Sequence, residues 1–371
     1  MARVVVLVGG RSSERAISLK TGLAVAGAFE RLGWDLRLLD TGRPALPALP
    51  LAEFRALPEL GAPDAAPPAA GREAGLPAPQ ALTQALAPRP GSAWQPDLVF
   101  IALHGGSGED GTVQALLDWL GLPYTGCGMA ASALAMDKWR SKMLLRDGGL
   151  AVPPGYLVEV PPPRLADPAY PEELARRLEA DPGWPAVIKP NREGSSVGLA
   201  VLASRAEALA ELPGVLAVSG ELLVEAFIPG RELTVAVLGG QALPLVEILP
   251  TSGLYDYQHK YEKGRTRYVC PAELPPALAA RVQADALKAW QLLGCRHLAR
   301  VDFRLAADGT PYCLEVNTIP GMTETSLFPM AAAAAGLDFP ALVAEIARLA
   351  LADAARRAAA AAPDERGQTP A

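Results

Sequence analysis

The chain has 371 residues, of which 50% are hydrophobic and 20% charged, a balance typical of a globular protein with two or three domains. A net charge of −6, with no basic run to offset it, argues against nucleic acid as a partner. No apolar stretch approaches the roughly 18 residues that span a bilayer, so we expect no membrane partner.

The first residues, MARVVVLVGG, lack the basic start and cleavage site of a signal peptide and are typical of a β-strand. The four cysteines, Cys127, Cys270, Cys295 and Cys313, form no CxxC pair. Scattered cysteines without an export signal indicate free thiols in a reducing compartment. We therefore expect a cytoplasmic protein.

The amino-terminal part alternates strand and helix. A continuous apolar run at residues 2–8 predicts a strand, and the polar loop GGRSSER leads from it into an apolar-periodic helix over about 16–32. A second strand is predicted at 34–40. This βαβ order predicts an α/β fold that begins with a Rossmann-like parallel-sheet domain.

Residues 44–96 hold twelve of the 36 prolines and predict a long irregular excursion with room for one short helix. The next strand, 96–103, ends in the loop HGGSGEDG before a helix at 112–121. Because open α/β sheets bind ligands beyond the carboxyl ends of their strands, Glu14 and His104 are predicted on one ligand-binding rim. Alternatively, Glu14 is only an acid in the first turn of a helix, where the helix dipole favours it.

The rest of the chain is predicted to be mostly antiparallel. The strand WPAVIKP, the Gly/Ser-rich loop NREGSSVG and a returning strand predict a hairpin, and ELLVEAFI and RELTVAVLGG continue the same sheet to about residue 249. The segment VPPG at 152–155 is typical of a hinge. Helices are predicted at about 132–148, at about 276–293 and from about 338, with a disordered tail at 359–371.

A hairpin near the carboxyl end, HLARVDFRLAADGTPYCLEVN, is the most informative part of the sequence. The Asp-Gly pair at 308–309 predicts a two-residue turn. Pairing centred on that turn places Asp302 opposite Glu315 and Arg300 opposite Asn317, all on one face. The other face, predicted to be buried, carries Val301, Phe303, Leu305, Tyr312, Leu314 and Val316.

Carboxylates directly opposite each other repel, unless a divalent cation lies between them. Asp302 and Glu315, with the neutral oxygen of Asn317, form an all-oxygen set that suits Mg²⁺ shared with substrate phosphates. The alternative is a solvated face on which Arg300 neutralises both acids. The hairpin alone leaves both interpretations open, and a one-residue bulge would break the register on which they rest.

Lysine is scarce among the basic residues. Only seven of 34 are lysine: Lys20, Lys138, Lys142, Lys189, Lys260, Lys263 and Lys288. Because the chain uses arginine by default, some of these positions are expected to need a compact ammonium group, which suits polyphosphate, and the others are expected to be exposed. Lys189 directly precedes NREGSSVG, whose backbone N–H groups can cradle phosphate.

Other nucleotide motifs are absent or incomplete. The P-loop pattern GxxxxGK[ST] does not occur. The run GCGMAA at 126–131 fits GxGxxA, but the strand before it is short and broken by Pro123, which argues against a dehydrogenase. Glu225 and Glu232 flank Phe227, a mixture of polar and apolar groups typical of an adenosine pocket and equally of a domain hinge.

Together these motifs resemble the D-alanine–D-alanine ligase family of the ATP-grasp superfamily over nearly the whole chain. The matching stretches are GGRSSERAISL, HGGSGEDG, MDKWRSK, IKPNREGSSVGL, YDYQHKY, ARVDF and LEVNTIPGMTETSL. The resemblance implies an N-terminal α/β domain at 1–130, a central ATP-grasp lid at 131–230 and a C-terminal ATP-grasp subdomain at 231–358, with ATP between the last two. Ala226 and Leu254 stand where a lysine and an aromatic residue are expected near the adenine.

The resemblance further implies a two-step ligation. ATP would phosphorylate the carboxylate of one D-alanine, and the amine of a second D-alanine would displace the phosphate. Asp302, Glu315 and Asn317 would hold two Mg²⁺ ions, which Mn²⁺ could replace. The nucleotide would be bound by Lys138, Lys189 and Lys260 at the phosphates, Glu225 and Phe227 at the adenine, Glu232 at the ribose, and by Glu315 and Asn317.

Around the amino acids, the resemblance implies that Glu14 binds the first ammonium group and joins Ser195 and Tyr261 in a hydrogen-bonded latch that excludes water. Arg300 and the backbone N–H of Gly321 would form the oxyanion hole. The other substrate-binding residues implied are Ser326 and Leu327 at the second carboxylate, Asn317, and His104 beside the substrates.

Family members are usually homodimers, and the same is implied here. A D-alanine–D-lactate ligase would share nearly every residue, but depsipeptide-forming members often carry phenylalanine at the position of Tyr261, so a tyrosine favours an amine nucleophile. Another ATP-grasp amino-acid ligase is disfavoured by the set Glu14, Tyr261 and Ser326. An inactive nucleotide-binding protein is disfavoured because the metal and oxyanion residues are all present.

Overall fold

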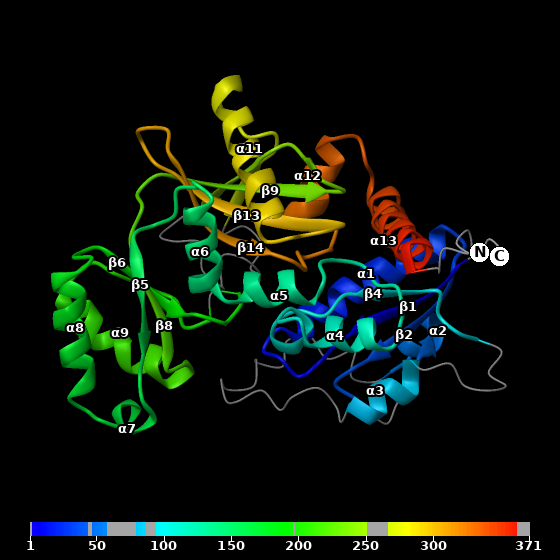
Figure 1. Cartoon of the computed structure of the whole chain (residues 1–371), viewed down its shortest axis with the longest axis horizontal. Helices are drawn as coiled ribbons and strands as arrows, with labels where there is room; N and C mark the ends of the chain where they lie inside the picture. Colours follow the sequence, from blue (N-terminus) through cyan, green and yellow to red (C-terminus); the bar gives the residue numbers. More distant parts are fainter. Residues whose placement is uncertain are drawn as a thin grey trace, which may run out of the picture.

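The computed structural model describes residues 2–43, 47–57, 79–86, 94–195, 197–250 and 266–361. In this part of the chain, three separate sheets are covered by helices, as Figure 1 shows. The arrangement confirms the predicted α/β class. No single described helix is long and apolar enough to cross a membrane. The helices α12 (Leu327–Ala334) and α13 (Phe339–Ala361) meet that test only as a pair, with a bend of 100° between them.

The first sheet has the strand order β3-β2-β1-β4. Its central strand β1 (Arg3–Val8) pairs in parallel with β2 (Asp35–Asp40) and β4 (Leu98–Ile101), and α1 (Arg15–Arg31) connects β1 to β2, as predicted. Alternate residues of β1 enter two hydrophobic cores, one shared with α1 and α13 and the other with α4 (Thr112–Trp119). Burial on both faces explains why β1 is apolar from Val4 to Val8.

The proline-rich excursion contains more structure than predicted. Its described residues form β3 (Leu49–Pro50), α2 (Leu51–Arg55) and α3 (Pro79–Leu86), so two short helices stand where one was expected. Leu51 and Phe54, and likewise Leu82 and Leu86, are spaced for one helical face and are buried. Apolar residues at that spacing let a short helix pack even where prolines surround it.

The single helix predicted at 132–148 is wrong. The chain forms α5 (Met129–Met136) and α6 (Lys138–Asp147), separated by Asp137, whose backbone is extended at φ −80° and ψ 91°. The Asp137 carboxylate accepts a hydrogen bond from the Arg140 backbone N–H at 3.0 Å and so caps α6. Lys138 therefore lies in the first turn of a new helix.

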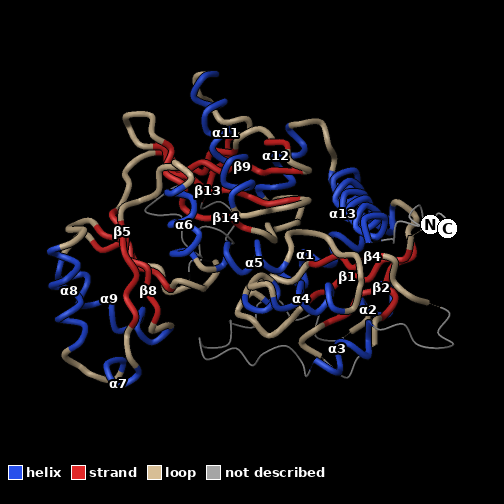
Figure 2. The backbone as a smooth tube through the Cα atoms, viewed as in Figure 1, coloured by secondary structure: helices blue, strands red, loops and turns tan. Residues whose placement is uncertain are grey.

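The second sheet has the order β5-β8-β6-β7 and is antiparallel, with the predicted hairpin between β6 and β7. Its strands are β5 (Gly155–Glu159), β6 (Ala186–Pro190), β7 (Ala200–Leu202) and β8 (Glu221–Ala226). Three helices absent from the prediction lie beside it (Figure 2): α7 (Pro162–Leu165), α8 (Tyr170–Ala180) and α9 (Arg205–Val218). The side chains of α8, α9 and this sheet form a separate hydrophobic core.

The third sheet has the order β12-β11-β9-β13-β14, with β10 paired to β9. The prediction that ELLVEAFI and RELTVAVLGG share a sheet is wrong, because β8 pairs with β5 and β6 whereas β9 pairs with β11 and β13. Gly230 lies between them with φ +144°, and a Cβ there would lie 2.0 Å from the Leu305 carbonyl oxygen. Only glycine permits this close crossing.

The strands of the third sheet are β9 (Arg231–Leu238), β10 (Gln241–Ala242), β11 (Val246–Pro250), β12 (Thr266–Val269), β13 (Leu298–Leu305) and β14 (Pro311–Asn317). The accompanying helices are α11 (Pro276–Leu292) and α13 (Phe339–Ala361), both predicted, and α12 (Leu327–Ala334), which was not. Since α13 continues to Ala361, the start of the predicted tail is helical, and 362–371 lie outside the described residues.

The predicted register of the β13–β14 hairpin is right at its functional end and wrong near its turn. Arg300 pairs with Asn317 and Asp302 with Glu315, but Phe303 pairs with Cys313, so the register shifts by one residue at a bulge. The connection is also longer than two residues, because Ala306 and Thr310 still pair across it. The bulge compensates for the longer turn.

The shift changes which side chains of β14 face the core. Cys313 is fully buried beside Val301 and Phe303, whereas Tyr312 and Leu314, predicted to be core residues, are only half-buried.

Candidate active site

A cleft of about 1040 Å³ of empty space, partly open to solvent, lies between the second and third sheets. Its lining includes the predicted site residues Lys138, Lys189, Ser195, Glu225, Phe227, Glu232, Arg300, Asp302, Glu315 and Leu327. The sequence motifs therefore converge on one place, although they come from five regions of the chain.

The other predicted site residues lie beside this cleft or outside the described residues. Asn317 donates from Nδ2 to Asp302 at 3.0 Å. Ser326 begins α12, and its hydroxyl accepts from the Thr323 backbone N–H at 3.1 Å, next to Gly321. Lys260 and Tyr261 are outside the described residues, so their predicted roles stay predictions.

Asp302 and Glu315 face each other across β13 and β14, as predicted. Asp302 also accepts two hydrogen bonds from the Arg300 guanidinium, at 2.9 and 2.8 Å, and one from the Thr234 hydroxyl at 2.6 Å. Glu315 lies 3.8 Å from the Lys138 ammonium. Both carboxylates are thus paired with cations here, and Arg300 contacts Asp302 as the alternative interpretation of the hairpin expected.

These oxygen atoms are suitable ligands for Mg²⁺, which prefers carboxylates and keeps part of its coordination for phosphate oxygens. The described residues contain no group of three or more His, Cys, Asp or Glu side chains able to hold a metal ion. Asp302, Glu315 and Asn317 comprise two carboxylates and one amide, so they fit an ion that completes its coordination with substrate. A cation bound to Asp302 would compete with the Arg300 fork.

On the opposite wall, the Glu225 carboxylate is held between two ammonium groups. Lys142 lies 2.6 Å from one oxygen and Lys189 2.8 Å from the other. Burial raises the pKa of Glu225, but the two lysines outweigh it, so its pKa lies below the ordinary value and the group is ionised. Burial likewise lowers the pKa of Lys189, but Glu225 and Glu315 raise it further, to a net value above the ordinary one.

Glu14 accepts a hydrogen bond from the Ser195 hydroxyl, which joins the loop after β1 to the Gly/Ser-rich loop after β6 over a separation of 181 residues. A Cβ on Gly105 or Gly194 would lie 2.7 Å from Glu14 Oε2, so a larger residue at either position would displace the Glu14 carboxylate; Gly105 also has φ +69°, which favours glycine. Glu14 is 7% exposed. It is the N-cap residue of α1, one position before the first turn, and its side chain makes no capping hydrogen bond. Its carboxylate bonds to Ser195 instead, so it is more than an acid placed by the helix dipole.

His104 occupies the same rim as Glu14. Its Nε2 lies 3.0 Å from the Thr21 hydroxyl, and its backbone carbonyl accepts from the Ser12 hydroxyl at 2.5 Å. Its Nδ1 lies 3.6 Å from Glu109. These contacts hold the loop HGGSGEDG against the loop GGRSSER, which makes His104 an organiser of the rim in this structure.

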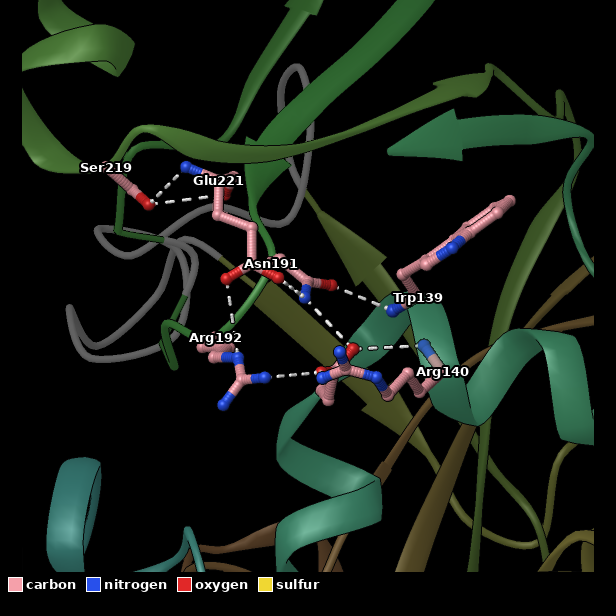
Figure 3. A network of polar contacts seen from close by, with 7 residues as sticks. Trp139, Arg140, Asn191, Arg192, Ser219 and Glu221 are labelled. Carbon is pink, nitrogen blue, oxygen red and sulfur yellow. Dashed lines mark hydrogen bonds and ion pairs between the residues drawn. The ribbon is translucent and has the colours of Figure 1, made fainter. Parts of the chain in front are cut away.

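Lys138 is positioned by a buried polar network around Asn191, drawn in Figure 3. The first two backbone N–H groups of α6 bond to Asn191: Lys138 N to its carbonyl at 3.2 Å and Trp139 N to its side-chain oxygen at 2.8 Å. Asn191 Nδ2 donates to Asp137 and to Glu221, at 3.0 and 2.8 Å. Because the loop NREGSSVG starts at Asn191, one residue ties α6, β8 and the root of that loop together.

From this root the loop returns to Lys138, whose ammonium donates to the Glu193 carbonyl at 2.6 Å. Sequence reasoning gave no role to Asn191, Asp137, Thr234 or Lys142. The scarcity of lysine had singled out Lys142, and an aspartate before an apolar-periodic segment is an ordinary N-cap signal. Asn191 and Thr234 carried no signal in the sequence.

Two antiparallel sheets, with a Gly/Ser-rich loop and lysines on one wall of the cleft and facing carboxylates on the other, are the arrangement of an ATP-grasp enzyme. Comparisons with known proteins agree. Residues 3–127 match the family model "D-ala D-ala ligase N-terminus", and residues 144–348 match "D-ala D-ala ligase C-terminus". The chain belongs to the D-alanine–D-alanine ligase family.

Individual relatives support this assignment. The D-alanine–D-alanine ligase of Synechococcus sp. (strain JA-3-3Ab) is 40% identical over 357 residues, 96% of this chain and 94% of the relative. The crystal structure of D-alanine–D-alanine ligase from Bacillus anthracis complexed with ATP is 30% identical, with a TM-score of 0.70 over 96% of this chain and 99% of that one. The VanG D-Ala:D-Ser ligase of Enterococcus faecalis is 27% identical, with a TM-score of 0.71 over 94% and 99% of the two chains.

Proposed function

We propose that the protein joins two D-alanine molecules into D-alanyl-D-alanine for peptidoglycan precursor synthesis, with ATP converted to ADP and phosphate. The observation that carries the proposal is the convergence of the family's motifs on one cleft, with lysines and an ionised Glu225 on one wall and the pair Asp302 and Glu315 on the other. Such a cleft can bind a nucleotide and balance the charge of its phosphates.

In this proposal the nucleotide lies between the second and third sheets. Lys138 and Lys189 contact the phosphates, together with Lys260. Glu225 accepts a hydrogen bond from the adenine amino group, Phe227 packs against the base, and Glu232 binds the ribose. Bound Mg²⁺, held by Asp302, Glu315 and Asn317, would neutralise charge on the transferring phosphoryl group.

The amino acids bind toward the first sheet. Glu14 fixes the ammonium of the first D-alanine, and its bond to Ser195 keeps the Gly/Ser-rich loop closed over the reacting atoms, with Tyr261 completing the latch. Closure matters because water would hydrolyse an acyl phosphate. Arg300 and the Gly321 N–H stabilise the oxyanion that forms when the second amine attacks, and Ser326 with the Leu327 backbone binds the second carboxylate.

We also propose the domain limits 1–130, 131–230 and 231–358, a homodimer, and a cytoplasmic location, all carried over from the family.

The first test of the proposed activity is phosphate release with ATP, Mg²⁺ and D-alanine, with the product identified by mass. L-alanine, D-lactate and D-serine serve as separate arms. D-alanine should stimulate release and yield the dipeptide. Equal turnover with L-alanine, or ester formation in preference to dipeptide, would refute the assignment.

A further inference from the structure

Lys142 is the buried lysine for which the proposed mechanism has no use. It lies on α6, its side chain is 3% exposed, and its ammonium contacts Glu225 Oε1 at 2.6 Å and the Cys313 carbonyl at 3.4 Å. Lys189 and Glu225 line the cleft, but Lys142 does not. It therefore reaches a ligand in the cleft only through Glu225.

Glu225 has more positive charge beside it than it needs for neutrality. Two ammonium groups from different elements, α6 and β6, contact one carboxylate. The other titratable groups that act on this cluster come from β14: Glu315, which acts on Lys189, and the Cys313 thiol, whose burial raises its pKa to about 12 and keeps it neutral. Burial lowers the pKa of Lys142, and Glu225 offsets this only in part.

The two lysines differ in what else they face. Lys189 is attracted to Glu315 as well as to Glu225, and it lines the cleft where phosphates are expected. A bound triphosphate would attract the Lys189 ammonium away from Glu225. Lys142 has no such competitor in the cleft, so it is the partner that stays with Glu225 when a nucleotide is bound.

The protonation state of Glu225 decides which purines it can accept. An ionised carboxylate only accepts hydrogen bonds, so it pairs with the 6-amino group of adenine. A protonated carboxyl can also donate, and it would then pair with the 6-oxo group of hypoxanthine. Buried carboxyls without a nearby cation tend to be protonated.

We propose that Lys142 is a positioning residue for base specificity, which holds Glu225 in the acceptor-only form and so excludes 6-oxopurine nucleotides. This inference rests on the proposed function in one respect, namely that Glu225 faces the base. The Lys142 side chain touches no nucleotide atom, and its effect passes through the Glu225 carboxylate.

The test compares ATP with inosine triphosphate, which differs at the 6-position of the purine. In Lys142→Met, the ratio of kcat/KM for ATP to that for inosine triphosphate should fall by about 10- to 100-fold near pH 6, the range for one hydrogen bond to a charged group. The ratio should recover at higher pH, because a Glu225 carboxyl that has lost Lys142, and whose other partner Lys189 is attracted by the triphosphate, has a higher pKa than in the wild type and ionises again as the pH rises. In the wild type the ratio should be flat over this range. Lys142→Arg, which keeps the positive charge, should retain the wild-type ratio.

Lys142→Met should fold, because it leaves Glu225 and Lys189 as a neutral buried pair. If it does not, Lys142→Gln, which keeps a hydrogen bond without the charge, replaces it with the same expected result. If Lys142→Met loses kcat/KM equally for ATP and inosine triphosphate, and the ratio of the two values does not depend on pH, Lys142 is only structural. An unchanged ratio in Glu225→Gln would show that Glu225 does not read the base.

The same ratio can be read from equilibrium binding of the two nucleotides by calorimetry, which needs no turnover. Absence of ligase activity in the wild type would therefore overturn the proposed function and leave this test in force. Conversely, full ligase activity with an unmoved nucleotide ratio would overturn this inference alone.

Discussion

Replacement of Asn191 by alanine should loosen the start of α6. Asn191 is fully buried, and its side chain accepts from Trp139 N and donates to Asp137 and Glu221. In Asn191→Ala the Trp139 N–H would lose its acceptor at a part-buried position, which costs about 1–3 kcal/mol where water does not replace the bond. The loss at the two carboxylates is smaller.

The smaller terms follow from the remaining partners. Asp137 keeps Arg140 and Arg192, at 2.5 and 2.7 Å, and Glu221, whose side chain is 32% exposed, can bond to water instead. The sum is about 2–4 kcal/mol, concentrated in the first turn of α6. Local opening there should then be about 30-fold more frequent or higher, since 1.4 kcal/mol corresponds to a factor of ten.

Hydrogen exchange measured on peptides from α6 reads this opening directly. The amides of the first turn should exchange faster in Asn191→Ala, while those of β9 and β13 stay protected. Ser219→Ala is the matched control. Among the residues that the structure describes, the Ser219 hydroxyl bonds to the Glu221 backbone alone, at 3.0 and 3.2 Å, so its loss should change α6 exchange little. Unchanged exchange in α6 of Asn191→Ala would refute the role of the network.

Three further outcomes are expected. Glu315→Gln should lower the rate of phosphate release by about 10²–10³-fold with an unchanged melting temperature. Asp308→Asn, a control at the hairpin turn, should leave that rate unchanged. If Glu315→Gln has an unaltered rate at limiting Mg²⁺, the carboxylate pair is structural. Tyr261→Phe should admit D-lactate as second substrate, more so at lower pH where the competing amine is protonated, and failure to form the ester at any pH from about 6 to 9 would contradict it. Burial lowers the pKa of His297 from 6.5 to about 4, so the free energy of unfolding should fall by up to about 3 kcal/mol as the pH drops through that window. In His297→Asn, whose side chain tolerates the φ of +60°, the urea concentration at the unfolding midpoint should depend less on pH than in the wild type.

The carboxylate pair could be predicted from sequence because strand alternation near the functional end of the hairpin is undisturbed. Asp302 and Glu315 face each other as the pattern requires. The same reasoning failed for Tyr312 and Leu314, because an Asp-Gly pair does not fix the length of a turn. Gly309 has φ +81° within the longer connection, and the extra residue is absorbed by a bulge that no local pattern marks.

Other features depend on contacts between distant segments, which no periodicity encodes. Lys142 and Glu225 meet although 83 positions separate their numbers, and the scarcity of lysine could single out Lys142 but not its partner. Glu14 was predicted at the ligand-binding rim from the βαβ order, but its bond to Ser195 followed only from family resemblance. The separation of β8 from β9 rests on the crossing at Gly230, which a sequence pattern of continuous strands conceals.

The chain enters and leaves the second sheet at neighbouring positions, because Gly155 at the start of β5 pairs with Glu225 at the end of β8. Its hydrophobic core is its own, whereas the first and third sheets share one. A segment with adjacent ends and a private core has the properties of an inserted domain. Residues 155–226 are therefore a natural unit for transplantation between homologues, and such chimaeras would exchange the Gly/Ser-rich loop without disturbing the carboxylate pair.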